Sequence, residues 1–225
     1  MSAALPPGQR EREDFPRFGL PPFADRQPVP PFRGSLRLLG RVVEAAEILA
    51  PLAGLERIER LSDFHCVTTW SKRNLRWGGV RFSDFYAAHV APRVAPGAHA
   101  RFVTAHGLDG YRTTLWLPDL LTDDALLADT LNGAPLSIGH GAPLRLVLPA
   151  QYGYKSVKHM DSLGLWDTHP RSQLPALAFM DHLRARVDRE ERGRWLPAWL
   201  LRQVYRPLIP WNVKRFSRGG AAASG

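Results

Sequence analysis

Cys66 is the only cysteine of the chain, and it stands in the segment 64–71, FHCVTTWS, beside histidine, threonine and tryptophan. One thiol excludes an internal disulfide and any zinc or iron–sulfur site built from several cysteines. The chemistry that remains open is that of a nucleophile, a redox thiol or a single thiolate ligand to the metal of a cofactor. The alternative without chemistry is a small buried hydrophobic side chain.

A second block of residues, 139–149, reads GHGAPLRLVLP and is followed by YGYKSVK at 152–158. It is an apolar, strand-like run bracketed by glycine and proline, with its histidine, arginine and lysines where the backbone is expected to turn. Arginine offers a planar fork to a phosphate, lysine a point charge, and turn amides add further donors. The block therefore predicts an anion site or, alternatively, an ordinary hairpin with solvated basic residues.

The two blocks, in this order, resemble the sulfite oxidase family of molybdopterin enzymes. In that family a cysteine in a C-x-T-x-W-S pattern ligates molybdenum, and a G-x-P-x-R-L-V-x-P run is followed by Y-G and then by Ser-x-Lys. The positions that match are Cys66, Thr68, Trp70, Ser71, His140, Arg145, Tyr152, Gly153, Ser156 and Lys158. The resemblance extends over residues 10–168.

This resemblance implies a molybdenum centre held by Cys66 and by two dithiolene sulfurs of molybdopterin, with two-electron oxygen-atom transfer on a small oxyanion or sulfoxide-type substrate. It also implies that Arg145, Lys158 and the amides around Ser156 bind the phosphate and pterin oxygens, and that His140 hydrogen-bonds the pterin. The predicted cofactor-binding residues are Arg17, His65, Cys66, Thr104, His140, Arg145, Ser156, Val157 and Lys158.

Length and composition fit one substantial domain. The chain has 225 residues, 44% of them hydrophobic, and a formal net charge of +9. Its apolar runs are far shorter than the roughly 20 residues that a membrane-spanning helix needs. The first residues resemble neither a secretory nor a twin-arginine leader, so we expect a cytoplasmic protein. The basic residues match no nucleic-acid-reading motif, and we expect no nucleic-acid partner.

We predict an α+β protein with the sulfite oxidase type of molybdopterin-binding fold, built from mixed sheets and short helices. Three segments are expected: an extended proline-rich arm at 1–34, the molybdopterin-binding domain at 35–170, and a basic helical appendage with a flexible tail at 171–225. Residues 171–225 are too few for the immunoglobulin-like dimerisation domain of sulfite oxidases, so that domain is expected to be absent.

Local patterns predict the elements of the fold. Strands are expected at 35–43, 57–61, 103 and 111–117, with turns at 77–80, 107–110 and 132–133. Helices are expected at 44–52, from a Ser83 cap to 89, after a Thr122 cap, and at 175–192 and 197–206.

The C-terminal segment 181–225 concentrates positive charge, with ten Lys and Arg against four Asp and Glu, and it interleaves three tryptophans. One hypothesis is that its helices make peripheral contact with an anionic membrane or an acidic partner. The other is that the segment packs on the main domain. The apolar face for such packing would consist of Leu183, Val187, Leu196, Leu200 and Val204.

Two classes of function remain open from the sequence. The first is the molybdenum oxidoreductase, and the second is a cofactor-free basic binding or scaffold protein that keeps the fold. Arg76, Arg81 and Arg112 are the candidates for an anion-attracting substrate mouth. Relatives carry a W-E-x-x-G-Y signature after the lysine turn, and here only Trp166 and the acid at Asp167 remain, so the substrate does not transfer. No haem-attachment motif is present, so a separate haem or flavin protein is expected to exchange electrons with the site.

Overall fold

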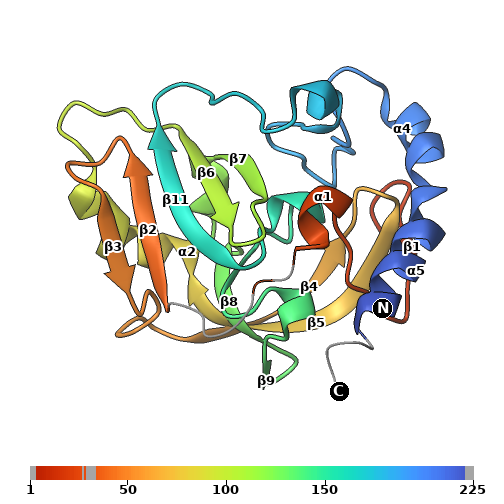
Figure 1. Ribbon diagram of the computed structural model, residues 1–225, viewed down its shortest axis with the longest axis horizontal. Helices are drawn as coiled ribbons and strands as arrows, with labels where there is room; N and C mark the ends of the chain where they lie inside the picture. Colours follow the sequence, from red (N-terminus) through yellow and green to blue (C-terminus); the bar gives the residue numbers. More distant parts are fainter. Residues whose placement is uncertain (1–3, 27, 29–33, 221–225) are drawn as a thin grey trace.

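The computed structural model describes residues 4–26, 28 and 34–220, and two mixed sheets dominate it (Figure 1). The first sheet has the order β1-β5-β8-β10, with β4 also paired to β5 and β9 to β8. The second has the order β3-β2-β11-β6-β7. The strands of the first sheet are β1 (Arg10–Glu11), β4 (Ile58–His65), β5 (Trp70–Arg81), β8 (Leu126–Leu131), β9 (Ala134–Pro135) and β10 (Arg145–Val147); those of the second are β2 (Ser35–Gly40), β3 (Ala46–Leu49), β6 (Phe102–Gly107), β7 (Arg112–Trp116) and β11 (Met160–Trp166).

The helices are short apart from the last. They are α1 (Pro21–Ala24), α2 (Phe82–Phe85), α3 (Leu117–Leu120), α4 (Ala198–Tyr205) and α5 (Leu208–Gly220), together with the π turn Tyr86–Val90 and 3-10 turns at Ala91–Arg93, Ile138–His140, Gly153–Lys155 and Pro175–Met180. The predicted α+β class with mixed sheets and short helices is confirmed. No helix in the described part of the chain is long and apolar enough to cross a membrane.

Alternation of apolar and polar residues explains how the sheets bury one face. In β2, Leu36 and Leu38 are fully buried while Arg37 between them is exposed. A strand places alternate side chains on opposite faces, so this pattern aims the leucines at the core. The largest core cluster joins residues of both sheets, including Leu38 and Leu163 from one sheet and Leu127 and Leu146 from the other. The core therefore lies between the sheets.

Several predicted elements are wrong, and packing against neighbouring strands gives the reason. Segment 44–52 is not a helix, because β3 pairs antiparallel with β2 and buries Ile48 opposite Leu36. Segment 77–80 is not a turn but part of β5, where Gly79 lets β8 approach closely. A Cβ on Gly79 would lie 2.0 Å from the carbonyl oxygen of Leu127.

Two helix predictions fail at their caps. The helix expected from Ser83 begins at Phe82, with Arg81 as its N-cap and no side-chain cap bond. Thr122 caps no helix; its hydroxyl donates to the carbonyl of Asp119 (2.9 Å), and the chain soon enters β8. The strands at 35–40, 58–65, 102–107 and 112–116 and the turn at Asn132 agree with the predictions.

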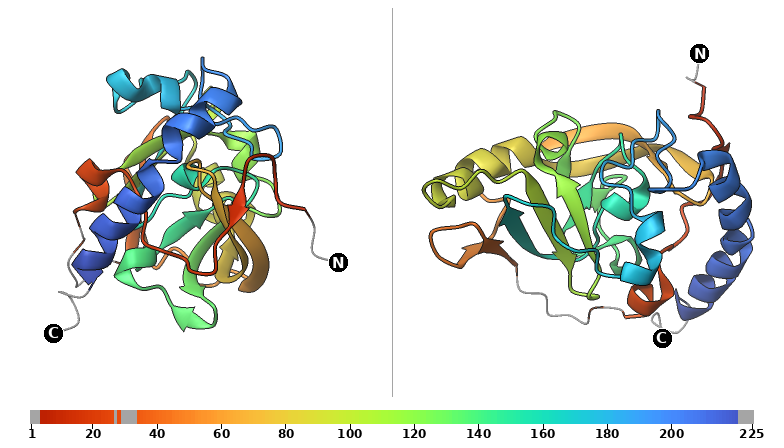
Figure 2. Two further views of the ribbon diagram at one scale, coloured as in Figure 1. Left: turned by 90° about the vertical axis from the view of Figure 1, so that its right-hand side faces the viewer. Right: turned by 90° about the horizontal axis from the view of Figure 1, so that it is seen from above.

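The C-terminal segment follows the edge of the molecule, where α4 and α5 are drawn in blue (Figures 1 and 2). The helix expected at 197–206 is present as α4, whereas 175–192 holds only a 3-10 turn followed by irregular backbone, and α5 was not predicted. The predicted packing face is partly wrong, because Val187 is buried but Leu196 and Val204 are exposed. The residues of α4 and α5 that are buried are Leu201, Tyr205, Asn212 and Phe216.

Candidate active site

Cys66 begins the tight turn that joins β4 to β5. Its amide donates to the carbonyl of Trp70 (2.8 Å), and the amide of Thr69 donates back to the carbonyl of Cys66 (3.1 Å). Thr69 closes the turn with a φ of 80°, an unusual value for a β-branched residue. The thiol is buried, and its Sγ lies 3.1 Å from the Oγ1 of Thr68. Burial raises the pKa of the thiol, while the Thr68 hydroxyl and the nearby cations Arg192 and Lys158 oppose that rise.

Side chains from the two ends of the chain hold this turn. Gln9, beside β1, donates from Nε2 to the carbonyl of Cys66 (3.1 Å). Arg192 donates from Nη1 to the carbonyl of Val67 (2.6 Å) and from Nη2 to the carbonyl of Pro7 (3.0 Å). The Arg192 side chain is completely buried, and Glu190 pairs with its Nε at 3.0 Å. The turn is therefore fixed from outside its own hairpin.

His65 lies behind the turn. Its Nδ1 is 2.7 Å from the Oγ of Ser71, which in turn donates to the Oε1 of Gln9 (3.1 Å). Burial lowers the pKa of His65, so the neutral ring is favoured. His65 is not among the residues that line the cavity described below, and its hydrogen bond to Ser71 joins the two strands that flank the turn, so its cofactor role stays a prediction.

Arg145 is a buried cation for which no described carboxylate serves as a counter-ion. Its side chain is fully buried; Nη1 donates to the carbonyl of His140 (2.8 Å), and Nε has no hydrogen-bond partner. The guanidinium stacks over the ring of Trp77, 4.7 Å from its centroid. Burial lowers the pKa of Arg145 to about 9. A buried cation with an unpaired donor favours the binding of an anion, which would balance the charge and accept the hydrogen bond.

Lys158 lies close to Arg145 and is also without an ion-pair partner among the described residues. Its Nζ donates to the carbonyl of Gly139 (2.8 Å). Burial, together with repulsion from Arg145 and Arg17, lowers the pKa of Lys158 to about 7. The same causes, burial and nearby cations, lower the pKa of His140 to about 4, and its ring stacks on Phe15 with a centroid separation of 4.7 Å. An anion bound here would relieve the repulsion between the two cations.

A cavity of about 400 Å³ brings the thiol and both cations together. Cys66, Arg145 and Lys158 all line it, although they come from a turn, from β10 and from the loop before β11. The rest of its wall is mostly apolar and aromatic. Three of the predicted residues thus converge on one space that a cofactor of mixed polarity could enter.

The other predicted residues surround this space without lining it. Arg17 donates to the carbonyl of Ala24 and lies over the ring of Phe216. The hydroxyl of Ser156 accepts from the amide of Leu148 (3.1 Å), and Val157 is buried in the core. Thr104, on β6, accepts from Nε1 of Trp166 (3.0 Å) and is not among the residues that line the cavity. A cofactor role for these residues stays a prediction.

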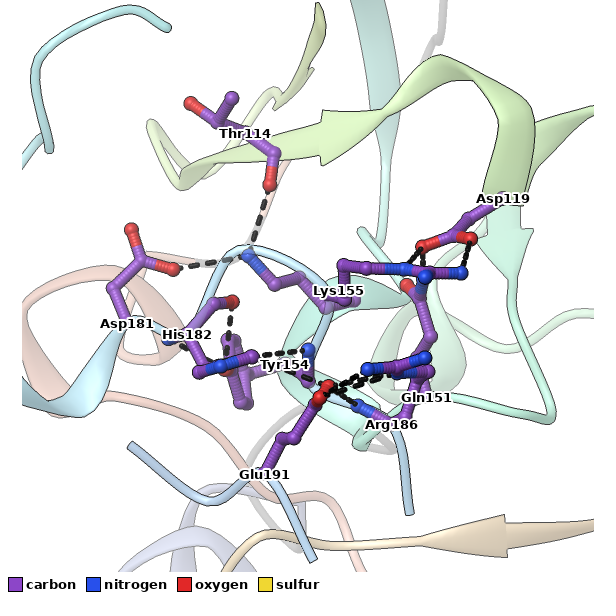
Figure 3. A network of polar contacts seen from close by, with 11 residues as sticks. Thr114, Asp119, Gln151, Tyr154, Lys155, Asp181, His182, Arg186 and Glu191 are labelled. Carbon is purple, nitrogen blue, oxygen red and sulfur yellow. Dashed lines mark hydrogen bonds and ion pairs between the residues drawn. The ribbon is translucent and has the colours of Figure 1, made fainter. Parts of the chain in front are cut away.

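Lys155, one of the two lysines of the 152–158 block, is a further buried cation. Its Nζ contacts the carbonyl of Thr114 (2.9 Å) and Asp181 (3.0 Å), as Figure 3 shows. Asp181 also lines the cavity. In the same network Arg186 pairs with Glu191 within the irregular segment after Asp181. The ion pair of Arg184 with Asp119 of α3 joins this segment to the domain. The ion pair was not predicted, because Lys155 and Asp181 are 26 residues apart and belong to no shared pattern.

The fold and the site together define a molybdopterin-dependent oxidoreductase domain. A family model described as "Oxidoreductase molybdopterin binding domain" matches residues 34–174, well over half of the chain. The chain belongs to this family, which confirms the resemblance drawn from Cys66 and Arg145.

Curated relatives give the same family. The chain is 32% identical to the "Uncharacterized oxidoreductase YuiH" of Bacillus subtilis over 76% of this chain and 83% of that protein. It is 35% identical to the "Protein-methionine-sulfoxide reductase catalytic subunit MsrP" of Xanthomonas axonopodis over 66% of this chain, and the match spans 49% of that relative. The solved sulfane dehydrogenase SoxCD from Paracoccus pantotrophus has the same fold, with a TM-score of 0.55 and 22% identity over 64% of this chain and 41% of that one.

Replacing Arg192 with alanine is expected to loosen the Cys66 turn. The change removes the donors to Val67 and Pro7, and one charge-assisted hydrogen bond corresponds to a roughly 10-fold change in a local opening equilibrium. Hydrogen–deuterium exchange of the peptide spanning 66–70 should therefore accelerate by about that factor. Arg202→Ala is the matched control, because Arg202 pairs with the same Glu190 and donates no bond to the turn. Equal exchange in Arg192→Ala and the unmodified protein would rule out this anchoring role.

Proposed function

We propose that this protein is a molybdenum-cofactor-dependent oxidoreductase that reduces a neutral sulfoxide by oxygen-atom transfer. The observation that carries the proposal is the cavity in which the thiol of Cys66 lies with Arg145 and Lys158, two cations without an acidic partner among the described residues. Cys66 would supply the thiolate to molybdenum, and the two cations would bind the phosphate of molybdopterin. The bound cofactor would supply the two-electron chemistry.

Charge at the cavity favours a neutral substrate over sulfite. Of the three arginines predicted for an anion mouth, only Arg112 lines the cavity. Arg81 pairs with Glu56 (2.7 Å) and Asp84, and Arg76 faces Glu59 on the same sheet. With Arg145 and Lys158 assigned to the cofactor, Arg112 is the one remaining cation among the residues that line the cavity, and the carboxylate of Asp181, which lines it too, is paired with Lys155. A dianion would find little compensation there, whereas a sulfoxide carries no net charge.

The proposed reaction consumes a sulfoxide, two electrons and two protons, and it yields a thioether and water. The sulfur–oxygen bond breaks and the sulfur is reduced. We propose that the electrons come from a separate haem or flavin protein. The name of MsrP supports the sulfoxide class, because that relative is a sulfoxide reductase by its printed name.

A direct test compares two substrates on molybdenum-loaded protein. Methyl phenyl sulfoxide should be reduced with a reduced viologen as electron donor. Sulfite, with ferricyanide as acceptor, should be oxidised with a kcat/KM at least roughly 100-fold lower. This ratio corresponds to about 2.7 kcal/mol in transition-state binding. Efficient sulfite oxidation would overturn the choice of substrate. Loaded protein that turns over neither substrate would refute the proposed sulfoxide reduction.

We propose, in addition, that α4 and the loop before it dock on an anionic membrane surface. Trp195 and Trp199 are 67% and 63% exposed, and Leu196 and Val204 are exposed beside them. Residues 192–225 contain seven Lys and Arg and no acidic residue. Three of these cations are paired with acids: Arg192, Arg202 and Arg215. Exposed tryptophan combined with a local excess of positive charge suits the interface of an acidic bilayer.

Vesicle co-sedimentation measures this docking. Wild-type protein should pellet with phosphatidylserine-containing vesicles more than with phosphatidylcholine vesicles, and less as salt shortens the Debye length below about 8 Å. Trp195→Ser combined with Trp199→Ser should lose most of this binding. Leu49→Ser, which changes a 76% exposed residue on β3, is the control and should keep it. Sedimentation that depends on neither lipid charge nor these tryptophans would leave an acidic protein or a second copy as the partner of this surface.

A further inference from the structure

The cavity has a second wall that comes from residues beyond the matched family domain, which ends at residue 174. This wall contains Met180, the last residue of the 3-10 turn, Asp181, which follows it, and residues of both C-terminal helices. The helical residues that line it are Tyr205, Leu208, Trp211 and Asn212. Helix α5 is held beside α1 by the ion pair between Arg215 and Asp25. The C-terminal segment thus completes the cavity around Cys66.

Two residues of this wall each carry a buried polar atom that lacks a partner among the described residues. Tyr205 is 1% exposed and its hydroxyl makes no hydrogen bond within the described structure; Asn212 is 5% exposed and the same is true of its Oδ1. The Nδ2 of Asn212 donates to the carbonyl of Leu208 (3.3 Å), which fixes the amide with its oxygen as the free group. Buried polar groups without partners are costly, so each points to a group that satisfies it.

The chemistry of the two atoms is complementary. Burial raises the pKa of Tyr205 to about 12, so the phenol keeps its proton at neutral pH and can donate a hydrogen bond. The Oδ1 of Asn212 can only accept one. A ligand group that suits both must carry an acceptor and a donor, be uncharged, and continue into an apolar part that contacts Leu208 and Trp211. A carboxamide meets these conditions, because its C=O accepts and its N–H donates.

We infer that Tyr205 and Asn212 form a substrate subsite that binds the carboxamide group of an amide-bearing sulfoxide. The inference rests on the proposed function for the reacting end of the substrate. Tyr205 donates to the amide carbonyl, Asn212 accepts from the amide N–H, and the aliphatic linker lies against Leu208 and Trp211. The two residues act on specificity and take no part in the oxygen-atom transfer.

The test compares two sulfoxides of the same shape. In 3-(methylsulfinyl)propanamide the substituent ends in a carboxamide, and in isopentyl methyl sulfoxide it ends in an isosteric isopropyl group. Tyr205→Phe and Asn212→Leu should each lower kcat/KM for the amide roughly 3- to 10-fold, through KM, since each removes one neutral hydrogen bond. Both variants should leave the isopentyl substrate unchanged and keep the wild-type molybdenum content. Tyr86→Phe, which alters a half-buried tyrosine outside the cavity, should change neither substrate.

The outcomes separate the subsite from the proposed function. An equal loss for both substrates, or no loss for the amide, overturns the subsite. If the loaded wild-type enzyme reduces neither sulfoxide, the proposed function fails, and the subsite is then judged by calorimetric binding of the unreactive sulfone 3-(methylsulfonyl)propanamide. Weaker binding of that sulfone by Tyr205→Phe supports the subsite, and equal binding refutes it.

Discussion

Changing Cys66 to serine is expected to remove molybdenum-dependent turnover while leaving the fold in place. A hydroxyl occupies a volume similar to that of the thiol and can keep the contact with Thr68, but it is a much poorer ligand for a soft metal centre. Even changes to the groups that support metal ligands lower metal affinity or activity about 10- to 100-fold. Loss of the ligand itself should therefore lower kcat by roughly 100-fold or more. Steady-state sulfoxide reduction normalised to protein measures this loss.

The fold of the Cys66→Ser variant provides the control. Its thermal midpoint without cofactor should lie within about 2–4 °C of the wild-type value, which corresponds to about 1 kcal/mol for a chain of this size. Wild-type turnover by the serine variant would mean that Cys66 is not the metal ligand. A large fall in the midpoint would instead indicate a structural role for the thiol.

Changing Arg145 to methionine is expected to separate cofactor affinity from the stability of the apoprotein. Arg145 is fully buried and pairs with no described carboxylate, so its charge contributes more to anion binding than to folding. Loss of a charge-assisted contact of about 1.5–3 kcal/mol should weaken cofactor retention roughly 10- to 150-fold. The thermal midpoint of the apoprotein should stay unchanged or rise, because methionine fills a similar volume without a buried charge.

Pterin content after purification and the apoprotein melting curve measure the two effects on one variant. Arg37→Met is the matched control, because Arg37 is an exposed arginine that pairs with Asp161 away from the cavity. This control should keep full pterin content. If Arg145→Met also kept it, the assignment of the buried cation to the cofactor would be wrong.

The sequence predicted the cofactor end of the site because its chemistry depends on residue type and local spacing. Cys66 and the Arg145 block are each continuous in sequence, and in the structure both reach the same cavity. The strand at 35–40 was predictable for the same reason, since its alternation of leucine and polar residues is local. Thr104 shows what this reasoning leaves out, because its hydroxyl accepts a hydrogen bond from Trp166, 62 residues later in the chain, and no local pattern indicates that contact.

The other half of the cavity could not be predicted because it depends on contacts between distant segments. Arg192 lies in a run of ordinary charged residues, and only the fold brings it to Val67, 125 residues earlier in the chain. Tyr205 belongs to a helix whose apolar residues suggested a different packing face, and Asn212 belongs to α5, which was not predicted. Segment 44–52 was wrongly predicted as a helix. Its structure is decided by pairing with β2, and local sequence does not reveal such a tertiary contact.

Elemental analysis of wild-type protein, combined with extraction of the pterin, tests the central claim most directly. Protein produced in a host that makes molybdenum cofactor should contain about one molybdenum and one molybdopterin per chain, as a single thiolate site requires. Both should fall sharply in Arg145→Met and stay at the wild-type level in Arg37→Met. Wild-type protein that folds in such a host and contains neither molybdenum nor pterin would contradict the account and leave the cofactor-free scaffold in its place.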